Sequence, residues 1–113
     1  MKQQYHEVFI TDSGETTVFR WRVEHPLRPG NLNGQLHRLD GPARIYANGD
    51  QEWWVRGLLH RLDGPAVIYA TGTQSWWVND QNITTQVNSW MQTQAVVWPW
   101  DDQTQMLFLL TWV

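Results

Sequence analysis

Two short loops carry most of the side chains that could take part in chemistry. Each loop holds a histidine, an arginine and an aspartate in the order His-Arg-x-Asp, followed by Gly-Pro: His37, Arg38 and Asp40, then His60, Arg61 and Asp63. Imidazole and guanidinium N–H groups suit an anionic ligand such as a phosphate. Tryptophan faces and arginine planes hold flat rings, and the chain has nine tryptophans. This combination predicts a binding site for a nucleotide-like anion.

We predict that six residues form this ligand-binding site, three from each of two similar segments: His37, Arg38, Trp54, His60, Arg61 and Trp77. A structural interpretation of the same loops competes with the functional one. An Asp before Gly-Pro usually accepts backbone N–H bonds in its own turn, so Asp40 and Asp63 would lock their turns. The two histidines would then hydrogen-bond a neighbouring hairpin.

Catalytic and metal chemistry have little support in the sequence. The chain lacks cysteine and has one lysine, Lys2, and it shows no nucleophile elbow, Walker loop or GxGxxG motif. Two histidines and two aspartates could bind a metal, but they lack HxH or HExxH spacing. Asp40 and Asp63 are equivalents, whereas a catalytic pair needs two different environments. We expect no catalytic residue, no metal and no cofactor, with a nucleotide hydrolase using His37 or His60 as the alternative.

The two loops belong to two copies of one repeat. Residues 34–56 and 57–79 align without a gap, and 17 of the 23 aligned pairs are identical. A fixed period of this length is typical of a repeat architecture. The elements that position the loops must therefore recur once per copy.

Each copy has the parts of a β-hairpin. Residues 43–46 and 52–55 are rich in aromatic and β-branched residues, which suit strands. Residues 48–49 read Asn-Gly, a strong hairpin signal, and residues 71–72 read Thr-Gly in the second copy. One copy is therefore expected to be loop, strand, tight turn and strand.

Strand alternation sorts the large side chains onto two faces. The first face is expected to carry Ile45, Trp53, Val55, Ile68, Trp76 and Val78. The second face is expected to carry Tyr46, Trp54, Tyr69 and Trp77, beside Arg44, Glu52 and Arg56. One face can be the core. The second is then an aromatic row, either open for stacking or covered by the C-terminal segment as a second core.

A weaker third copy precedes the two clear ones. Residues 8–10 and 17–21 read as strands around a turn at residues 12–14. Aligning Gly14 with Gly49 places Val18 and Phe19 on Trp53 and Trp54, and residues 22–33 insert a longer connection. This is the irregular form that terminal repeats usually take.

The repeat pattern ends at Asp80. Ile83, Val87, Trp90 and Met91 then recur at helical spacing, with Thr84 as the expected N-cap. Residues 95–98 suggest a short strand, and residues 101–102 open a turn or short helix. Residues 106–113 are apolar except Thr111, which favours a terminal strand buried on both faces, with a terminal helix as the alternative. Such an end must be covered, so we expect a homo-oligomer, most simply a dimer.

The length of 113 residues fits a single domain. We divide it into an irregular N-terminal hairpin and connection (1–33), two repeats (34–79) and a C-terminal helix and strand segment (80–113). The expected fold class is mainly β (α+β). A net charge of −3 argues against nucleic-acid binding by counterion release. The start lacks the apolar core of a signal peptide and no apolar run could span a bilayer, so we expect a cytoplasmic protein without a membrane partner.

The repeat unit G-x-L-H-R-x-D-G-P-A-x-I-Y-x-x-G-x-x-x-W-W-V resembles the MORN-like repeats of small phage and giant-virus proteins. The resemblance covers residues 34–79 by motif and the N-terminal 33 residues by pattern only. It implies a row of antiparallel hairpins and a viral protein acting in the host cytoplasm. Combined with the candidate site, it suggests a sponge that sequesters a nucleotide immune signal. The alternative is an inhibitor that docks its Trp-rich face on a host protein, because Trp, Tyr and Arg also dominate protein interfaces.

Overall fold

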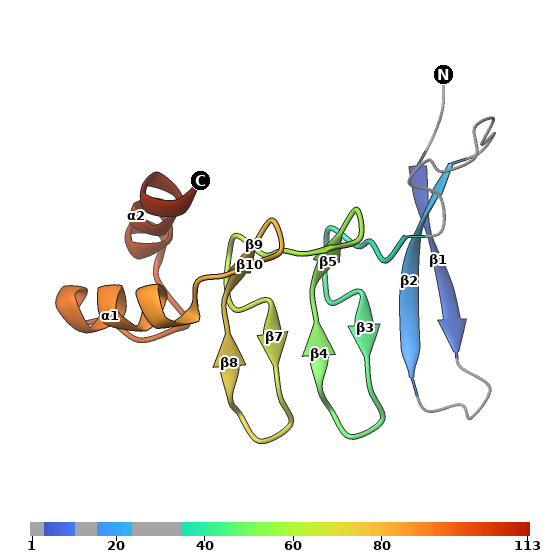
Figure 1. Ribbon diagram of the computed structural model, residues 1–113, viewed down its shortest axis with the longest axis horizontal. Helices are drawn as coiled ribbons and strands as arrows, with labels where there is room; N and C mark the ends of the chain where they lie inside the picture. The colour runs from blue at the N-terminus through green and yellow to red at the C-terminus, as the bar shows by residue number, and fades with distance from the viewer. Residues whose placement is uncertain (1–3, 11–15, 24–34) are drawn as a thin grey trace.

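The computed structural model describes residues 4–10, 16–23 and 35–113, and it shows hairpins side by side in a row with two helices after them (Figure 1). One six-stranded antiparallel sheet has the order β1-β2-β3-β4-β7-β8. Its strands are β1 (Gln4–Ile10), β2 (Thr17–Val23), β3 (Arg44–Ile45), β4 (Gln51–Glu52), β7 (Val67–Ile68) and β8 (Gln74–Ser75). The chain is therefore mainly β (α+β), the fold class that the sequence predicted, and it ends in two helices where the sequence predicted one helix and a terminal strand.

The two predicted hairpins of residues 34–79 are confirmed. Strand β3 pairs with β4, and β7 pairs with β8. The turns fall where expected: Gly49 has φ 101° and Gly72 has φ 94°. Each glycine donates its N–H to a tyrosine carbonyl, Tyr46 at 3.0 Å and Tyr69 at 2.8 Å. Glycine reaches this left-handed region without the steric cost of a Cβ, which explains why both turns carry it.

A second, smaller hairpin, which the sequence did not predict, joins the end of each repeat to the segment that follows it. Its strands are β5 (Trp54–Val55) and β6 (Leu58–Leu59) where the first copy meets the second, and β9 (Trp77–Val78) and β10 (Gln81–Asn82) at the end of the second. Arg56 and Gly57 both have positive φ, 53° and 78°, as a tight two-residue type I′ turn requires. The strand expected over 52–55 is therefore split at Trp53 into β4 and β5.

The N-terminal hairpin is confirmed in its strands, with β1 antiparallel to β2 and Val8 opposite Phe19. The expected turn at 12–14 and most of the connection at 22–33 lie outside the described residues. The alignment that placed Phe19 on Trp54 is wrong by one residue. Phe19 N donates to Ala43 O at 2.7 Å, as Trp53 N donates to Ala66 O at 2.7 Å. Phe19 is therefore the equivalent of Trp53.

Helix α1 (Thr84–Gln94) forms where the apolar spacing predicted it, but its N-cap is Ile83, so the expected cap at Thr84 is wrong. The Thr84 hydroxyl instead accepts a hydrogen bond from Trp76 N at 3.0 Å. The short strand expected at 95–98 is also wrong. Ala95 adopts φ 56° at the end of α1, and the chain then runs as a connection without regular structure to residue 101.

The expected terminal strand is wrong as well, because residues 102–112 form helix α2 (Asp102–Trp112). The Asp101 carboxylate caps this helix by accepting from Thr104 N at 2.8 Å, and that bond lowers the pKa of Asp101. Once the cap starts a helix, Leu and Met continue it readily. Phe108 is fully buried while Leu110 is 75% exposed, so the apolar run covers both the inner and the outer side of α2.

The core lies between the last repeat and the two helices. Its buried members are Trp76, Ile83, Val87 and Phe108. Trp76 stacks on Trp100 with ring centroids 6.2 Å apart and planes 18° apart. The C-terminal segment thus covers the face of Trp76. The opposite row does not belong to this core, since Trp77 is half-buried outside it and Tyr69 is 44% exposed. The alternative of a second core over that row is therefore wrong.

Within the part of the chain that the structure describes, neither helix is both long and apolar enough to cross a membrane.

Candidate ligand groove

Each His-Arg-x-Asp-Gly-Pro loop is folded around its own arginine. Arg61 Nε donates to Asp63 Oδ1 at 2.8 Å, and Arg61 Nη1 donates to Pro65 O at 3.0 Å. Arg38 makes the same two bonds in the first copy, at 2.9 and 3.2 Å. A Cβ on Gly64 would lie 2.8 Å from Arg61 Cζ, so glycine is needed for the arginine to lie against the loop. Each carboxylate therefore holds the arginine of its own loop.

The same guanidinium groups join neighbouring repeats. Arg61 Cζ lies 3.9 Å from the ring centroid of Trp53, and Arg38 Cζ lies 3.9 Å from that of Phe19. Such a contact combines cation–π attraction with stacking of the flat guanidinium. Each loop thus rests on the aromatic ring of the hairpin before it in the chain.

The histidines tie each loop to the last residue of its own repeat, in the turn of the small hairpin that begins there. His37 Nδ1 accepts from Arg56 N at 3.0 Å, and His60 Nδ1 accepts from Asn79 N at 2.9 Å. A ring nitrogen that accepts a backbone N–H carries no proton, so the neutral tautomer has its proton on Nε2. Burial lowers the pKa of His60 and favours this neutral form.

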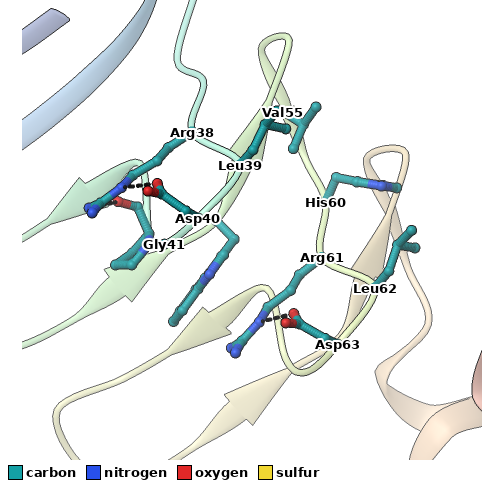
Figure 2. A pocket seen from close by; sticks show the side chains of 11 residues that line it. Arg38, Leu39, Asp40, Gly41, Val55, His60, Arg61, Leu62 and Asp63 are labelled. Carbon is teal, nitrogen blue, oxygen red and sulfur yellow. Dashed lines mark hydrogen bonds and ion pairs between the residues drawn. The ribbon is translucent and has the colours of Figure 1, made fainter. Parts of the chain in front are cut away.

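A groove of about 620 Å³ lies between the two loops. Figure 2 shows its two Arg–Asp pairs on neighbouring loops, with His60 and Leu62 along the second loop. Trp53 and Val55 line it from the first repeat. A smaller hollow of about 370 Å³ adjoins it and is lined by both His37 and His60.

The structure brings three of the six predicted site residues to this groove: Arg38, His60 and Arg61. His37 is buried and lines only the smaller hollow. The two predicted tryptophans line neither of these hollows. Trp54 Nε1 donates to Glu52 Oε1 at 3.0 Å, and Trp77 Nε1 donates to Ser75 Oγ at 2.9 Å. The six residues therefore do not converge on one site.

A polar network confirms the predicted second face in the first repeat. Arg44 Nη1 donates to Tyr46 Oη at 3.0 Å, and Tyr46 Oη donates to Glu52 Oε1 at 3.3 Å. Trp54 bonds to the same Glu52 oxygen. Burial raises the pKa of Tyr46. None of the residues of this network lines the groove.

The aromatic residue of the groove, Trp53, was not among the predicted site residues. Alternation placed it correctly on the face opposite Trp54, but that face was taken as core. The sequence contained a signal for the role of Trp53, because an arginine equivalent to Arg61 and an aromatic residue equivalent to Trp53 both recur once per repeat. An arginine and an aromatic residue with one period are candidates for stacking between successive units.

The groove lining is balanced in formal charge, with Arg38 and Arg61 against Asp40 and Asp63. Each guanidinium has five N–H donors, and the loop bonds use two of them. Among the described residues, no group of three His, Cys, Asp or Glu side chains could hold a metal ion. The arrangement can hold a planar or anionic group.

Comparison with protein-family models, with curated proteins and with solved structures finds no match to this chain.

Proposed function

We propose that this protein is a non-catalytic binding module that holds a small nucleotide-like anion in the groove between its two loops. The observation that supports the proposal is the groove itself, which combines Arg38, Arg61 and Trp53 in about 620 Å³. Ligand sites for small molecules typically measure about 300–1,000 Å³ and place a few polar groups among apolar ones. Guanidinium N–H groups suit phosphate oxygens.

The charge balance of the groove limits the ligand. Asp40 and Asp63 have side chains that are 79% and 76% exposed, so a ligand with many phosphates would meet two carboxylates as well as two guanidiniums. A mononucleotide, which has a single phosphate monoester, or a cyclic dinucleotide, which has one negative charge per phosphate diester, fits better than a polyphosphate. We expect micromolar affinity, about 8 kcal/mol of binding free energy.

The biological role that we propose follows from the resemblance of the repeat to MORN-like units of small phage and viral proteins. In that setting the module would act in the host cytoplasm as a sponge, removing a nucleotide immune signal without turning it over. No step of chemistry is assigned to the groove, because the side chains of Asp40 and Asp63 are similarly exposed and each holds its own arginine.

Calorimetric titration with cyclic dinucleotides and ADP-ribose derivatives tests the proposal. Chromatography of the heat-released ligand then separates the outcomes. Recovery of an intact ligand supports sequestration, and recovery of a cleaved product means that the protein is an enzyme. The variant Trp77→Phe is a control because Trp77 does not line the groove, so we expect it to bind normally.

A second candidate is a protein-interaction module that inhibits a host protein through its Trp-rich face. The row of Tyr46, Trp54, Tyr69 and Trp77 favours it, because the helices leave this row uncovered and Tyr69 is 44% exposed. If no nucleotide gives heat with the intact protein, this candidate replaces the sponge. Loss of partner binding in Tyr69→Ala would then identify the row as the interface.

A further inference from the structure

Two side chains from the C-terminal segment of the protein lie against the second loop, and they indicate which chemical groups fit beside such a loop. Trp98 Nε1 donates to Asp63 O at 3.4 Å, and Gln105 Nε2 donates to Leu62 O. The Trp98 ring also lies against the loop, since a Cβ on Gly64 would come within 3.0 Å of it. Two adjacent carbonyls of the second loop therefore receive two N–H donors, one of them on a flat aromatic ring.

Trp98 also contacts the arginine of that loop. Arg61 Cζ lies 3.9 Å from the centroid of the Trp53 ring and 5.5 Å from that of the Trp98 ring. The equivalent arginine of the first loop, Arg38, lies 3.9 Å from the Phe19 ring, and its loop forms one wall of the groove. Because the two loops are equivalent, each has an equivalent position beside it. Trp98 occupies that position beside the second loop, and the groove is that position beside the first.

Exposure supports this equivalence. The Arg61 side chain is 14% exposed and the Arg38 side chain 23%. Pro65 is fully buried whereas Pro42 is half-buried, and Leu39 is 73% exposed. The first loop has the same shape as the second. The surface that Trp98 and Gln105 cover on the second loop is exposed on the first.

We propose that the groove takes a planar heteroaromatic ring that stacks on Arg38 and directs two N–H donors at the carbonyls of Leu39 and Asp40. A carbonyl oxygen has two lone pairs, so it accepts such a donor in addition to any bond within the protein. In a nucleotide, guanine meets this requirement, because its N1–H and N2–H₂ donors are adjacent. Adenine has an acceptor beside its amino group. This assignment rests on the proposed nucleotide-binding function and specifies its base.

Calorimetric titration of the intact protein with GMP and with AMP tests the assignment. We expect GMP to bind about tenfold more tightly than AMP, the effect of one well-placed hydrogen bond. Arg38→Lys keeps the charge but removes the planar face, and it should weaken GMP binding about tenfold. Arg44→Lys is the matched control, because Arg44 belongs to the same repeat, bonds Tyr46 and does not line the groove. It should bind GMP as the unmodified protein does.

The outcomes separate this inference from the proposed function. Equal affinity for GMP and AMP overturns the base assignment and leaves nucleotide binding standing. Absence of heat with both nucleotides and with the cyclic dinucleotides overturns both. A third probe, N-acetyltryptophanamide, has the indole of Trp98 itself. If it binds while GMP does not, the occupant is a tryptophan side chain of a partner polypeptide and the guanine assignment fails.

Discussion

The guanidinium of Arg61 lies over the Trp53 ring, with Arg61 Cζ 3.9 Å from the ring centroid. The same side chain bonds Asp63 and the carbonyl of Pro65. One arginine thus organises its own loop and fastens that loop to the preceding repeat. A chain with short strands and few buried aliphatic residues depends on such contacts, because each two-residue strand alone buries little apolar surface.

Replacing Arg61 with alanine should therefore destabilise the fold strongly. The change removes two charge-assisted hydrogen bonds and one cation–π contact, and it uncovers Trp53. We expect a loss of about 2–4 kcal/mol in the free energy of unfolding, measured by urea denaturation. The unfolding free energy of Arg61→Lys should lie between those of the unmodified protein and of Arg61→Ala, because lysine keeps the charge but lacks the planar guanidinium. A loss below about 0.5 kcal/mol would show that the stacking carries little of the stability.

Asp63→Ala should cost much less than Arg61→Ala. The sequence suggested a buried turn-locking carboxylate, but the Asp63 side chain is 76% exposed and pairs with Arg61 in contact with solvent. Exposed ion pairs contribute about 0–1 kcal/mol, so a change in melting temperature of only a few degrees is expected. Thermal unfolding followed by circular dichroism measures it. A cost as large as that of Arg61→Ala would contradict this ranking of the two residues.

The stability of the protein should fall as the pH falls below about 6.5, the ordinary histidine pKa. Burial lowers the pKa of His60 in the folded state. As the pH falls, His60 is therefore protonated in the unfolded chain before it is protonated in the folded chain. The stability is fully present above the unfolded pKa and is lost as the pH falls below it. Protonation also places an N–H where His60 Nδ1 accepts from Asn79 N.

Urea denaturation from about pH 8 to about pH 5 follows this effect across the histidine range. His60→Asn is the control, because the amide oxygen accepts a hydrogen bond and does not titrate. The variant should show a flatter dependence of unfolding free energy on pH. An unchanged pH dependence in His60→Asn would assign the effect to other groups.

The protein should be a homo-oligomer that hides the outer face of α2. Met106, Leu110 and Val113 are 60%, 75% and 71% exposed, and an apolar stripe of this kind is typical of an interface. Light scattering at micromolar concentration should give the mass of a dimer, and Leu110→Glu should give that of a monomer. A monomeric mass for the unmodified protein would refute the oligomer.

Much of the fold could be predicted because two copies of one motif repeat the same local signals. Asn48-Gly49 fixed one turn, and the identical spacing of Thr71-Gly72 fixed its equivalent. The small hairpins with type I′ turns at 56–57 and 79–80 were not predicted. Arg56 is a residue type that rarely adopts positive φ, whereas Asn79 and Asp80 tolerate it and were an available signal. The prediction of a terminal strand was wrong because a run of apolar residues has no periodicity that distinguishes a strand from a helix. The N-cap at Asp101 favours the helix.

The candidate site was predicted only in part, for a different reason. Residue types identified Arg38 and Arg61, but composition does not show that each arginine already bonds an aspartate two residues away. Trp54 and Trp77 were chosen as stacking residues of the second face, which the sequence left either open or covered by the C-terminal segment. The face of a strand can be read from alternation, whereas the face that the helices cover depends on contacts between distant segments.

The row of repeats ends at the start of helix α1. Trp53 N donates to Ala66 O of the following repeat, and Trp76 N, its equivalent, donates to the Thr84 hydroxyl at 3.0 Å. Ile83 N likewise donates to Trp76 O as His60 N donates to Trp53 O. The start of α1 thus makes the bonds that a third repeat would make, and Thr84 satisfies a donor at the open end of the sheet.

Thr84→Val keeps the shape of the side chain but removes this acceptor. Trp76 is 2% exposed, so its backbone N–H would stay out of water without a partner, at a cost of about 1–3 kcal/mol. Thr84→Ser retains the hydroxyl and should lose clearly less. Urea denaturation of the three proteins compares them, and amide hydrogen exchange at Trp76 should accelerate in Thr84→Val alone. If Thr84→Val and Thr84→Ser prove equally stable, the hydroxyl does not terminate the sheet, and packing of the helices against Trp76 accounts for the end of the array.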